Sequence, residues 1–189
     1  MPPGTKWYTK AGTEKYSQGN PERAKALARE AGYKGEAIRY MCTTSYMNHY
    51  NSSVVLVKQL KDAGFNIDMQ IYDWATLVSR RAQPNLWDLF YTTHGFVPDP
   101  MLWTFMSPTY PGWWDTPRKR QYTTEFTSTV DSAKRMEAMQ KIQGLFYEEV
   151  PLLRTGDEFT YDIYAPKVQG IGDSTLSEFN RFWNVWLRK

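Results

Sequence analysis

The chain has few of the residues that most often build redox and metal sites. It contains one cysteine and two histidines in 189 residues. A single Cys42 excludes an internal disulfide and a zinc site made of several cysteines, and it leaves the redox compartment open. The two histidines do not have the spacing of a metal-binding pair, so we expect neither a metal ion nor a cofactor.

The net charge is small, and the apolar runs are short. The formal net charge is +3, and the longest basic run is Arg118-Lys119-Arg120. This is too little to indicate a surface for nucleic acid. We find no apolar run long enough to cross a membrane and no signal peptide within these residues. Aromatic residues are abundant instead, at 16% with eight Trp and thirteen Tyr. This content is typical of proteins that enclose small ligands, although a core and surface rich in rings would give the same count.

The order of expected elements indicates an α/β fold. Residues 36–43 and 66–72 alternate between apolar and polar side chains, which predicts two strands, and the apolar run 87–93 predicts a third. A helix ending at Gly64 and a short helix capped by Asp73 separate them. Strands that alternate with helices in this way form a mainly parallel sheet flanked by helices. Further helices are expected after Asn20, over 118–129 and, capped by Asp131, over 131–149. The helix that ends at Gly64 should bury Val54. A single turn or short helix is expected over 101–106, and further strands are expected over 151–153 and 159–165.

Ligands of open α/β sheets bind at the carboxyl ends of the strands. We therefore expect a binding site where the run 87–93 ends. The candidate residues come from this end, from the preceding loop 44–50 and from a later loop that is rich in Gly and Pro. They are Tyr46, Asn48, His94, Phe96, Asp99 and Trp113.

Several short stretches then resemble, in their order and spacing, the C-terminal lobe of the peptide/nickel-type (family 5) extracytoplasmic solute-binding proteins of ABC importers. The stretches are Asn20–Leu27 with Glu30–Tyr33, Leu60–Phe65 with Tyr72–Trp74, Trp87–Asp88 with Pro98–Pro100, and the helix that ends in Glu148-Glu149-Val150-Pro151. The resemblance implies a lobe of the periplasmic-binding-protein type II fold. It also implies a longer, two-lobed protein whose N-terminal lobe is missing from this chain.

The resemblance further implies how the chain is organised and where it works. We expect an extended lead-in over 1–19, a solute-binding lobe over 20–165, and a segment over 166–189 that in the family crosses to the other lobe. The expected partners are a small solute and a membrane permease. The expected location is the periplasm or the extracellular face of a bacterial membrane. One lobe alone should bind its solute weakly.

The solute class follows less directly. Dipeptide binders of this family carry an acidic residue shortly before the Asp-Pro step, and here residues 95–98 hold no carboxylate. The anchor for a peptide's amino group is therefore absent unless Asp99 replaces it. Rings such as Phe96, Trp113 and Tyr46 would suit a sugar or an opine-like solute better. Peptide, opine and sugar classes all remain open.

Two other function classes are weighed against solute binding. A hydrolase could use His94 or His49 as its base, with Asp99 as the orienting group. The chain has no Gly-x-Ser-x-Gly elbow and no phosphate-binding Gly-rich loop, so we predict no catalytic residue. A protein–protein interaction module that uses Trp113, Trp114 and the C-terminal aromatic residues stays open.

Overall fold

The computed structural model describes residues 1–189 with the exception of 17, 159–160, 162 and 172–181. The chain divides into two compact units, and each gathers segments that are far apart in the sequence. We call Thr13–Thr93 with Ser107–Trp114 the sheet unit. We call Met1–Gly12, His94–Met106 and Asp115–Lys189 the helical unit.

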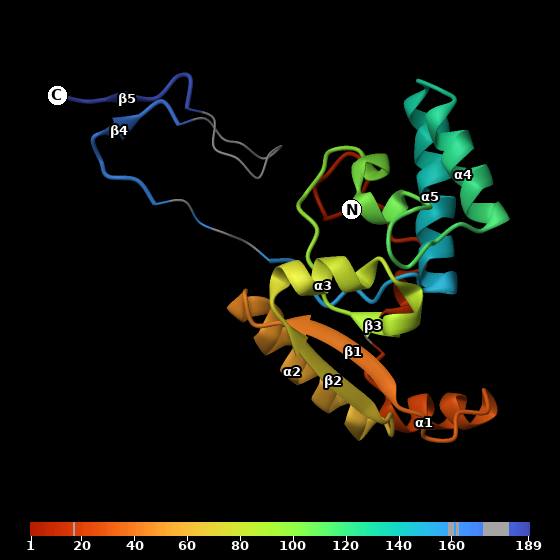
Figure 1. Ribbon diagram of the computed structural model, residues 1–189. Helices are drawn as coiled ribbons and strands as arrows, with labels where there is room; N and C mark the ends of the chain where they lie inside the picture. The colour runs from red at the N-terminus through yellow and green to blue at the C-terminus, as the bar shows by residue number, and fades with distance from the viewer. Residues whose placement is uncertain (17, 159–160, 162, 172–181) are drawn as a thin grey trace. The chain divides into compact units, whose positions relative to one another are not determined.

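The sheet unit contains three parallel strands. They are β1 (Ile38–Thr43), β2 (Ile67–Tyr72) and β3 (Leu89–Phe90), in the spatial order β2-β1-β3. Figure 1 shows β1 between the other two, and the register pairs Ile38 with Ile67 and Met41 with Phe90. The parallel sheet predicted from the alternating pattern is therefore confirmed.

The third strand is shorter than the run 87–93 predicted. Only Leu89 and Phe90 are strand residues, and the turn η2 (Pro84–Leu86) precedes them. Backbone hydrogen bonds nevertheless continue on both sides of β3, from Asp88 N to Arg39 O and from Tyr91 N to Met41 O, each 3.0 Å long. The segment therefore lies along β1 over four residues.

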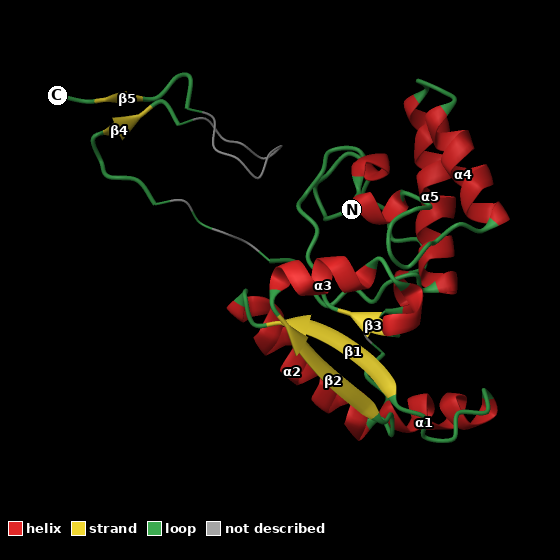
Figure 2. Cartoon of the chain, in the orientation of Figure 1, coloured by secondary structure: helices red, strands yellow, loops and turns green. Residues whose placement is uncertain are grey.

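Helices α2 (Met47–Asp62) and α3 (Trp74–Arg81) cover opposite faces of this sheet, as Figure 2 shows. On the α2 face the core consists of Tyr40, Cys42, Val57 and Ile67. On the other face Met41 and Leu77 are both fully buried. Opposite faces are what two right-handed crossovers require when the strand order reverses direction between them.

The start of α2 differs from the sequence prediction. The expected loop 44–50 is cut short because the helix begins at Met47, with Tyr46 as its N-cap. Val54, expected to be buried, is 44% exposed, and Ser53 is buried in its place. The short Ser53 side chain lets the helix approach β1, where its Oγ accepts a hydrogen bond from the Tyr40 hydroxyl at 3.1 Å.

The predicted helix caps are confirmed. Helix α1 (Pro21–Glu30) begins after Asn20, whose side chain accepts a hydrogen bond from Arg23 N at 2.9 Å. Asp73 accepts from both the backbone N and the hydroxyl of Thr76 at the start of α3. These bonds satisfy amide groups that a helix start otherwise leaves without acceptors.

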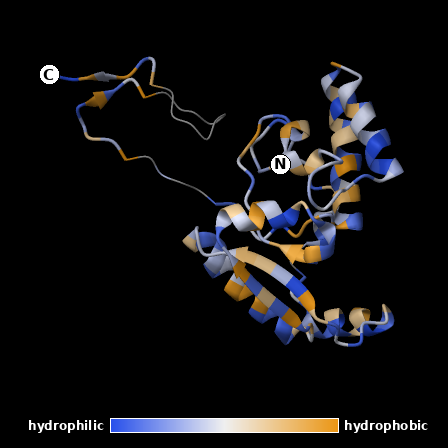
Figure 3. Cartoon of the chain, viewed as in Figure 1, coloured by the Kyte–Doolittle hydropathy of each residue, from blue (hydrophilic) through white to orange (hydrophobic). Residues whose placement is uncertain are grey.

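The helical unit is built on α4 (Pro117–Thr127) and α5 (Ser132–Glu149), which pack side by side in Figure 1. Thr116 and Asp131 cap them, the second as predicted. Two single turns, η3 (Pro100–Leu102) and η4 (Thr104–Met106), precede α4, as predicted for 101–106. Figure 3 shows hydrophobic and hydrophilic residues alternating along α5, whose buried members include Met139 and Ile142.

Within the expected lead-in over 1–19, the residues around Trp7 pack against α4 and α5. The indole of Trp7 is 3% exposed and meets the ring of Phe126 edge to face at 5.1 Å. The Gln143 side-chain amide donates hydrogen bonds to the carbonyls of Thr9 and Ala11. The turn η1 (Thr13–Lys15) follows in the sheet unit. The division at residues 19 and 165 stays a prediction.

The last described elements form a two-stranded sheet. Strands β4 (Val168–Gln169) and β5 (Trp186–Leu187) pair antiparallel, with Val168 opposite Leu187. Pro151–Leu153, expected as a strand, is not one: Pro151 and Leu152 form a bend directly after Val150, which closes α5 in the left-handed conformation. Of the strand expected over 159–165, residues 159, 160 and 162 lie outside the described residues. That segment 166–189 crosses to another lobe stays a prediction.

Candidate functional site

A cluster of rings lies where β1 and β2 end. It consists of Tyr46, His49, Trp74 and Tyr91, and we call it the edge cluster. The Tyr46 ring centroid lies 5.1 Å from that of His49 and 5.4 Å from that of Trp74. His49 lies 5.8 Å from Trp74 and 5.2 Å from Tyr91. The rings therefore meet at the edge of the sheet where the sequence placed a binding site.

The connections that leave the strands bring these rings together. Thr43 Oγ1, at the end of β1, accepts a hydrogen bond from Ser45 N at 3.1 Å and so tightens the turn into α2. Ser45 Oγ in turn accepts from Trp74 N at 3.0 Å, which joins this turn to the start of α3. Two hydroxyl groups thus hold the first turns of both helices at the same edge.

His49 is the buried member of the edge cluster, at 4% exposed. Its Nε2 lies 3.2 Å from Thr93 Oγ1, within hydrogen-bond distance. Its backbone carbonyl accepts from Ser53 Oγ at 2.7 Å, and Ser53 is bonded in turn to Tyr40. Burial raises the pKa of Tyr40 to about 12, so this hydroxyl stays protonated and keeps donating to Ser53 at any physiological pH.

Tyr46 is the exposed member of the edge cluster, at 45%. Asn48, in the first turn of α2, is exposed as well, and Trp74 is half-buried. The edge therefore offers aromatic rings and a neutral amide to solvent. Asp73, the carboxylate beside Trp74, is engaged by Thr76, and these hydrogen bonds lower its pKa. Such a surface can stack on a planar group or on the CH face of a sugar.

Trp113 lies in the sheet unit but beside a different end of the strands. Its indole stacks on Trp87, with 5.8 Å between centroids and 21° between planes, and Trp87 precedes β3. Trp113 has a positive φ of 45° and is 39% exposed, whereas Trp114 is buried. The structure therefore places Trp113 toward the amino end of β3, while Tyr46 follows the carboxyl end of β1.

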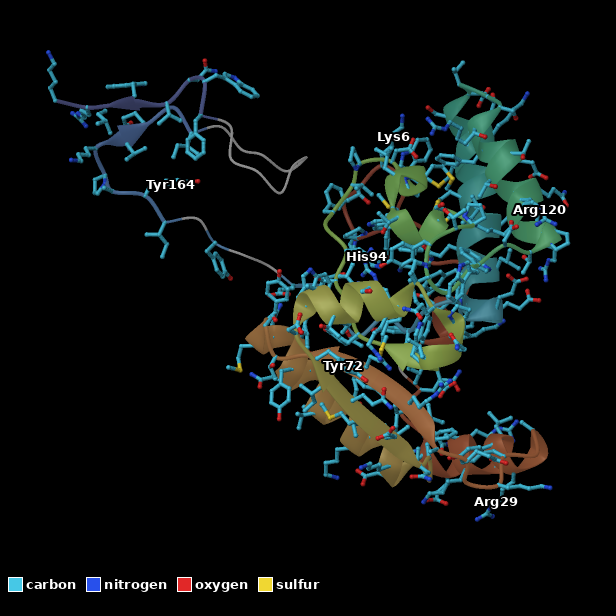
Figure 4. The ribbon with its side chains drawn as sticks, viewed as in Figure 1. Lys6, Arg29, Tyr72, His94, Arg120 and Tyr164 are labelled. Carbon is cyan, nitrogen blue, oxygen red and sulfur yellow. The ribbon has the colours of Figure 1, made fainter. Side chains whose placement is uncertain are left out.

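Two arginines on α3 pack against rings, which the sequence did not indicate. The Arg81 guanidinium lies over Trp74, Phe90 and Tyr110 at 5.5 to 5.9 Å. The Arg80 guanidinium lies 4.6 Å from the Tyr72 ring, which is labelled in Figure 4. These cation–π contacts link α3 to β2, to β3 and to the loop that carries Tyr110.

In the helical unit, His94 and Phe96 lie in one irregular stretch. His94 Nδ1 is 3.1 Å from Thr104 Oγ1, and its ring meets Phe105 at 5.2 Å. The label in Figure 4 marks His94 in this stretch. Phe96 is 37% exposed. Trp103 Nε1 donates to the carbonyl of Gly95 at 3.1 Å and so anchors the backbone between the two candidates.

Asp99 makes structural contacts. Its Oδ1 accepts from Met101 N at 2.9 Å at the start of η3, and its Oδ2 pairs with Arg135 Nη2 at 2.6 Å. The Arg135 guanidinium also lies over the rings of Trp7 and Phe126, at 4.6 and 4.1 Å. The charge of this carboxylate is therefore already matched by a cation of the same unit.

The six sequence-predicted residues fall into two sets. Tyr46, Asn48 and Trp113 belong to the sheet unit, and His94, Phe96 and Asp99 to the helical unit. That all six contact one solute stays a prediction. Trp74 and Thr93 are not among the residues that the sequence predicts for the site, and His49 enters there as a possible catalytic base. The sequence signal for these three residues is that each follows one of the strands β1, β2 and β3.

The one imidazole of the edge cluster is poorly accessible. The imidazole of His49 is enclosed by rings, and with 4% exposure it offers little to a substrate. In the described part of the chain, no group of three His, Cys, Asp or Glu could hold a metal ion. Among the described helices, none is long and apolar enough to cross a membrane.

Comparison with known proteins gives a family match. The model of the bacterial extracellular solute-binding proteins, family 5 (middle region), matches residues 1–113. A curated relative is the Sinorhizobium fredii protein named "Probable peptide ABC transporter periplasmic-binding protein y4tO". It is 28% identical over an alignment of 178 positions, and the alignment covers 88% of this chain and 33% of that protein. The chain thus spans about a third of the length of this relative.

Solved structures share the fold. A dipeptide-binding protein from a Pseudoalteromonas species, in complex with Met-Leu, gives a TM-score of 0.71 at 19% identity. The match covers 99% of this chain and 39% of that one. The periplasmic binding protein MelB of Agrobacterium fabrum, in complex with stachyose, gives 0.62 at 17% identity, over 79% of this chain and 27% of that one. These matches confirm the expected α/β lobe of the periplasmic-binding-protein type II fold.

Proposed function

Because the chain belongs to family 5 of the bacterial extracellular solute-binding proteins, we propose that it is part of the solute-binding subunit of an ABC importer. In this role it binds a small organic solute outside the cytoplasmic membrane and presents it to a membrane permease. Since the chain spans 33% of its curated relative, we propose that residues beyond these 189 complete the binding site.

The edge cluster is the observation that supports this proposal most directly. It lies at the carboxyl end of parallel strands, where α/β folds bind their ligands, and it exposes the Tyr46 ring next to Trp74. Binding without chemistry is consistent with the burial of His49. We therefore propose that the chain captures its solute unchanged, in agreement with the binding proteins that it resembles.

For the solute class, we propose that stacking on rings contributes more than ion pairing. Asp73 caps α3 and Asp99 pairs with Arg135, so each of these carboxylates already has a partner for its charge or lone pairs. The exposed groups of the edge include the Tyr46 ring and the Asn48 amide. They suit the CH faces and hydroxyls of a sugar, and also the side chains of a peptide or an opine. The name of the curated relative favours a peptide.

Ligand-observed NMR with the 189-residue chain tests the proposal, with Met-Leu and stachyose as probes. One lobe supplies about half of the contacts, so a solute bound at micromolar affinity by the whole site is expected near millimolar here. Tyr46→Ala should weaken the binding of the active probe at least about fivefold, as loss of an anchor ring does.

Val55→Ala is the matched control for this experiment, because Val55 lies on the same helix and is 56% exposed. It should bind like the unmodified chain. If neither probe, nor any member of a panel of dipeptides, opines and oligosaccharides, bound at millimolar concentration, the proposed function would be wrong. Equal binding by Tyr46→Ala and Val55→Ala would move the site away from the edge cluster.

A further inference from the structure

Tyr46 occupies the N-cap of α2 without the side-chain hydrogen bond that usually fixes this position. Its backbone is extended, with φ −127° and ψ 118°, and its side chain makes no capping bond. Polar N-cap residues bond back to the first turn of the helix, whereas a tyrosine must be held by packing. The position of this exposed ring therefore depends on the rings that it contacts, which are His49 and Trp74.

His49 is well placed to hold the Tyr46 ring. It lies three residues further along α2, so its side chain lies on the same side of the helix as residue 46. Its backbone carbonyl is fixed through Ser53 to Tyr40 on β1. Its ring is fixed on one side by Tyr91, and its Nε2 lies 3.2 Å from the hydroxyl of Thr93.

Thr93 comes from a distant part of the chain. It lies 44 positions after His49, beyond the carboxyl end of β3, and it is the last residue of this segment of the sheet unit. A hydrogen bond at this place ties the start of α2 to the end of the third strand. Since Thr93 is itself exposed, a change at this residue leaves the buried core of the sheet intact.

We infer that His49 and Thr93 are positioning residues, whose hydrogen bond holds the ring of Tyr46 in the orientation that contacts the solute. This inference rests on the proposed function for its effect on affinity. Neither residue needs to touch the solute. The hydroxyl of Thr93 orients the imidazole, and the imidazole supports the exposed ring.

The first test reads the position of Tyr46 without any solute. The chain is labelled with 3-fluorotyrosine, and the 19F resonance that disappears in Tyr46→Phe is assigned to residue 46. Thr93→Val keeps the shape of the side chain but removes the hydroxyl, so it should shift or broaden this resonance. Thr93→Ser keeps the hydroxyl, so its Tyr46 resonance should lie where it lies in the unmodified chain. Val55→Ala should leave it unchanged.

The second test measures binding of Met-Leu and stachyose by the same variants. Loss of one hydrogen bond should weaken the active probe about threefold to tenfold in Thr93→Val, with recovery in Thr93→Ser. A Tyr46 resonance unchanged by Thr93→Val, or moved equally by Thr93→Ser, would overturn the inference. So would full affinity in Thr93→Val. A shifted resonance in a chain whose unmodified form binds no solute would instead contradict the proposed function and leave the positioning intact.

Discussion

Arg39 and Asp88 stand 49 positions apart and join β1 to the residue before β3 by a two-pronged ion pair. The guanidinium donates from Nε to Oδ2 at 3.0 Å and from Nη2 to Oδ1 at 2.8 Å. The backbone N of Arg39 also donates to Asp88 Oδ2 at 2.8 Å. Hydrogen bonds from Arg39 lower the pKa of Asp88. One carboxylate therefore helps to set the register between β1 and β3.

We predict that Asp88→Asn lowers the midpoint of thermal unfolding at pH 7 by a few degrees. The effect is modest because the Asp88 side chain is 41% exposed and water screens the pair. The pKa of Asp88 in the folded chain lies below its unfolded value of about 4. The stabilisation by the ion pair is therefore present above pH ~4 and disappears as the pH falls through the folded pKa.

Circular dichroism melts from pH 7 to pH 3 check this prediction. Asp62→Asn, which breaks the exposed pair between Lys58 and Asp62, serves as the control and should change the midpoint little. A difference between Asp88→Asn and the unmodified chain that persists undiminished at pH 3 would show that the ion pair is not its cause.

The buried hydroxyl of Tyr40 predicts the opposite pH dependence. Its pKa is raised to about 12 by burial, whereas the pKa of a tyrosine in an unfolded chain is about 10. The unmodified chain should therefore lose stability as the pH rises from 10 to 12, by up to about 3 kcal/mol. Tyr40→Phe should lose less over this window, although it is less stable at pH 7 because the bond to Ser53 is gone.

Urea unfolding at pH 7, 10 and 11.5 measures these slopes. Tyr161→Phe removes a tyrosine that is 88% exposed, and it should follow the slope of the unmodified chain. Identical slopes for Tyr40→Phe and Tyr161→Phe would contradict the assignment of the alkaline loss to Tyr40.

The features that the sequence predicted well are those governed by nearby residues. Asn20, Asp73 and Asp131 each cap a helix within the next three residues, and the alternating strands need only their own pattern. Burial along α2 was predicted less well, because Ser53 is buried by a hydrogen bond from Tyr40 on another element. Hydrophobicity alone favours Val54 for that position.

The candidate site shows the same limit. Tyr46 could be placed at the carboxyl edge because the alternation of strands and helices along the chain predicts parallel strands, whose carboxyl ends share one edge. Trp113 could not, since its position depends on a positive φ of 45° and on stacking with Trp87, 26 positions earlier. The sequence around Asp99 does not indicate its partner Arg135, which lies 36 positions later on α5. Contacts between distant segments decide each of these cases.

Gly12 and Gly4 offer a matched pair of substitutions near the N-terminus. Both have positive φ, 76° and 81°, so Ala is strained at either position. A Cβ at Gly12 would also lie 2.9 Å from Tyr147 Cδ2, whereas a Cβ at Gly4 meets nothing within 4 Å. Gly12→Ala should therefore destabilise the chain by about 1–3 kcal/mol more than Gly4→Ala, by overpacking.

Chemical unfolding of the two variants measures this difference. The comparison also tests the packing of residues 1–12 on α5, which Trp7 and Gln143 support. If Gly12→Ala and Gly4→Ala were equally stable, the segment would not be held against Tyr147 as the structure shows.

The last prediction concerns Asp99, the candidate anchor for the amino group of a peptide. Its carboxylate already pairs with Arg135, and the two side chains are 31% and 22% exposed. Asp99→Asn should therefore lower the free energy of unfolding by about 1–2 kcal/mol, because Arg135 loses its partner while it is partly buried. Asp115→Asn, which breaks the more exposed pair with Arg120, should cost less.

Titration of Met-Leu separates the structural role from an anchoring role. If the Asp99 carboxylate paired with the ammonium of the dipeptide, Asp99→Asn would remove most of the binding affinity. Because the carboxylate is engaged by Arg135, the substitution should change the affinity less than about threefold, and a larger loss at unchanged stability would identify Asp99 as the missing acidic anchor.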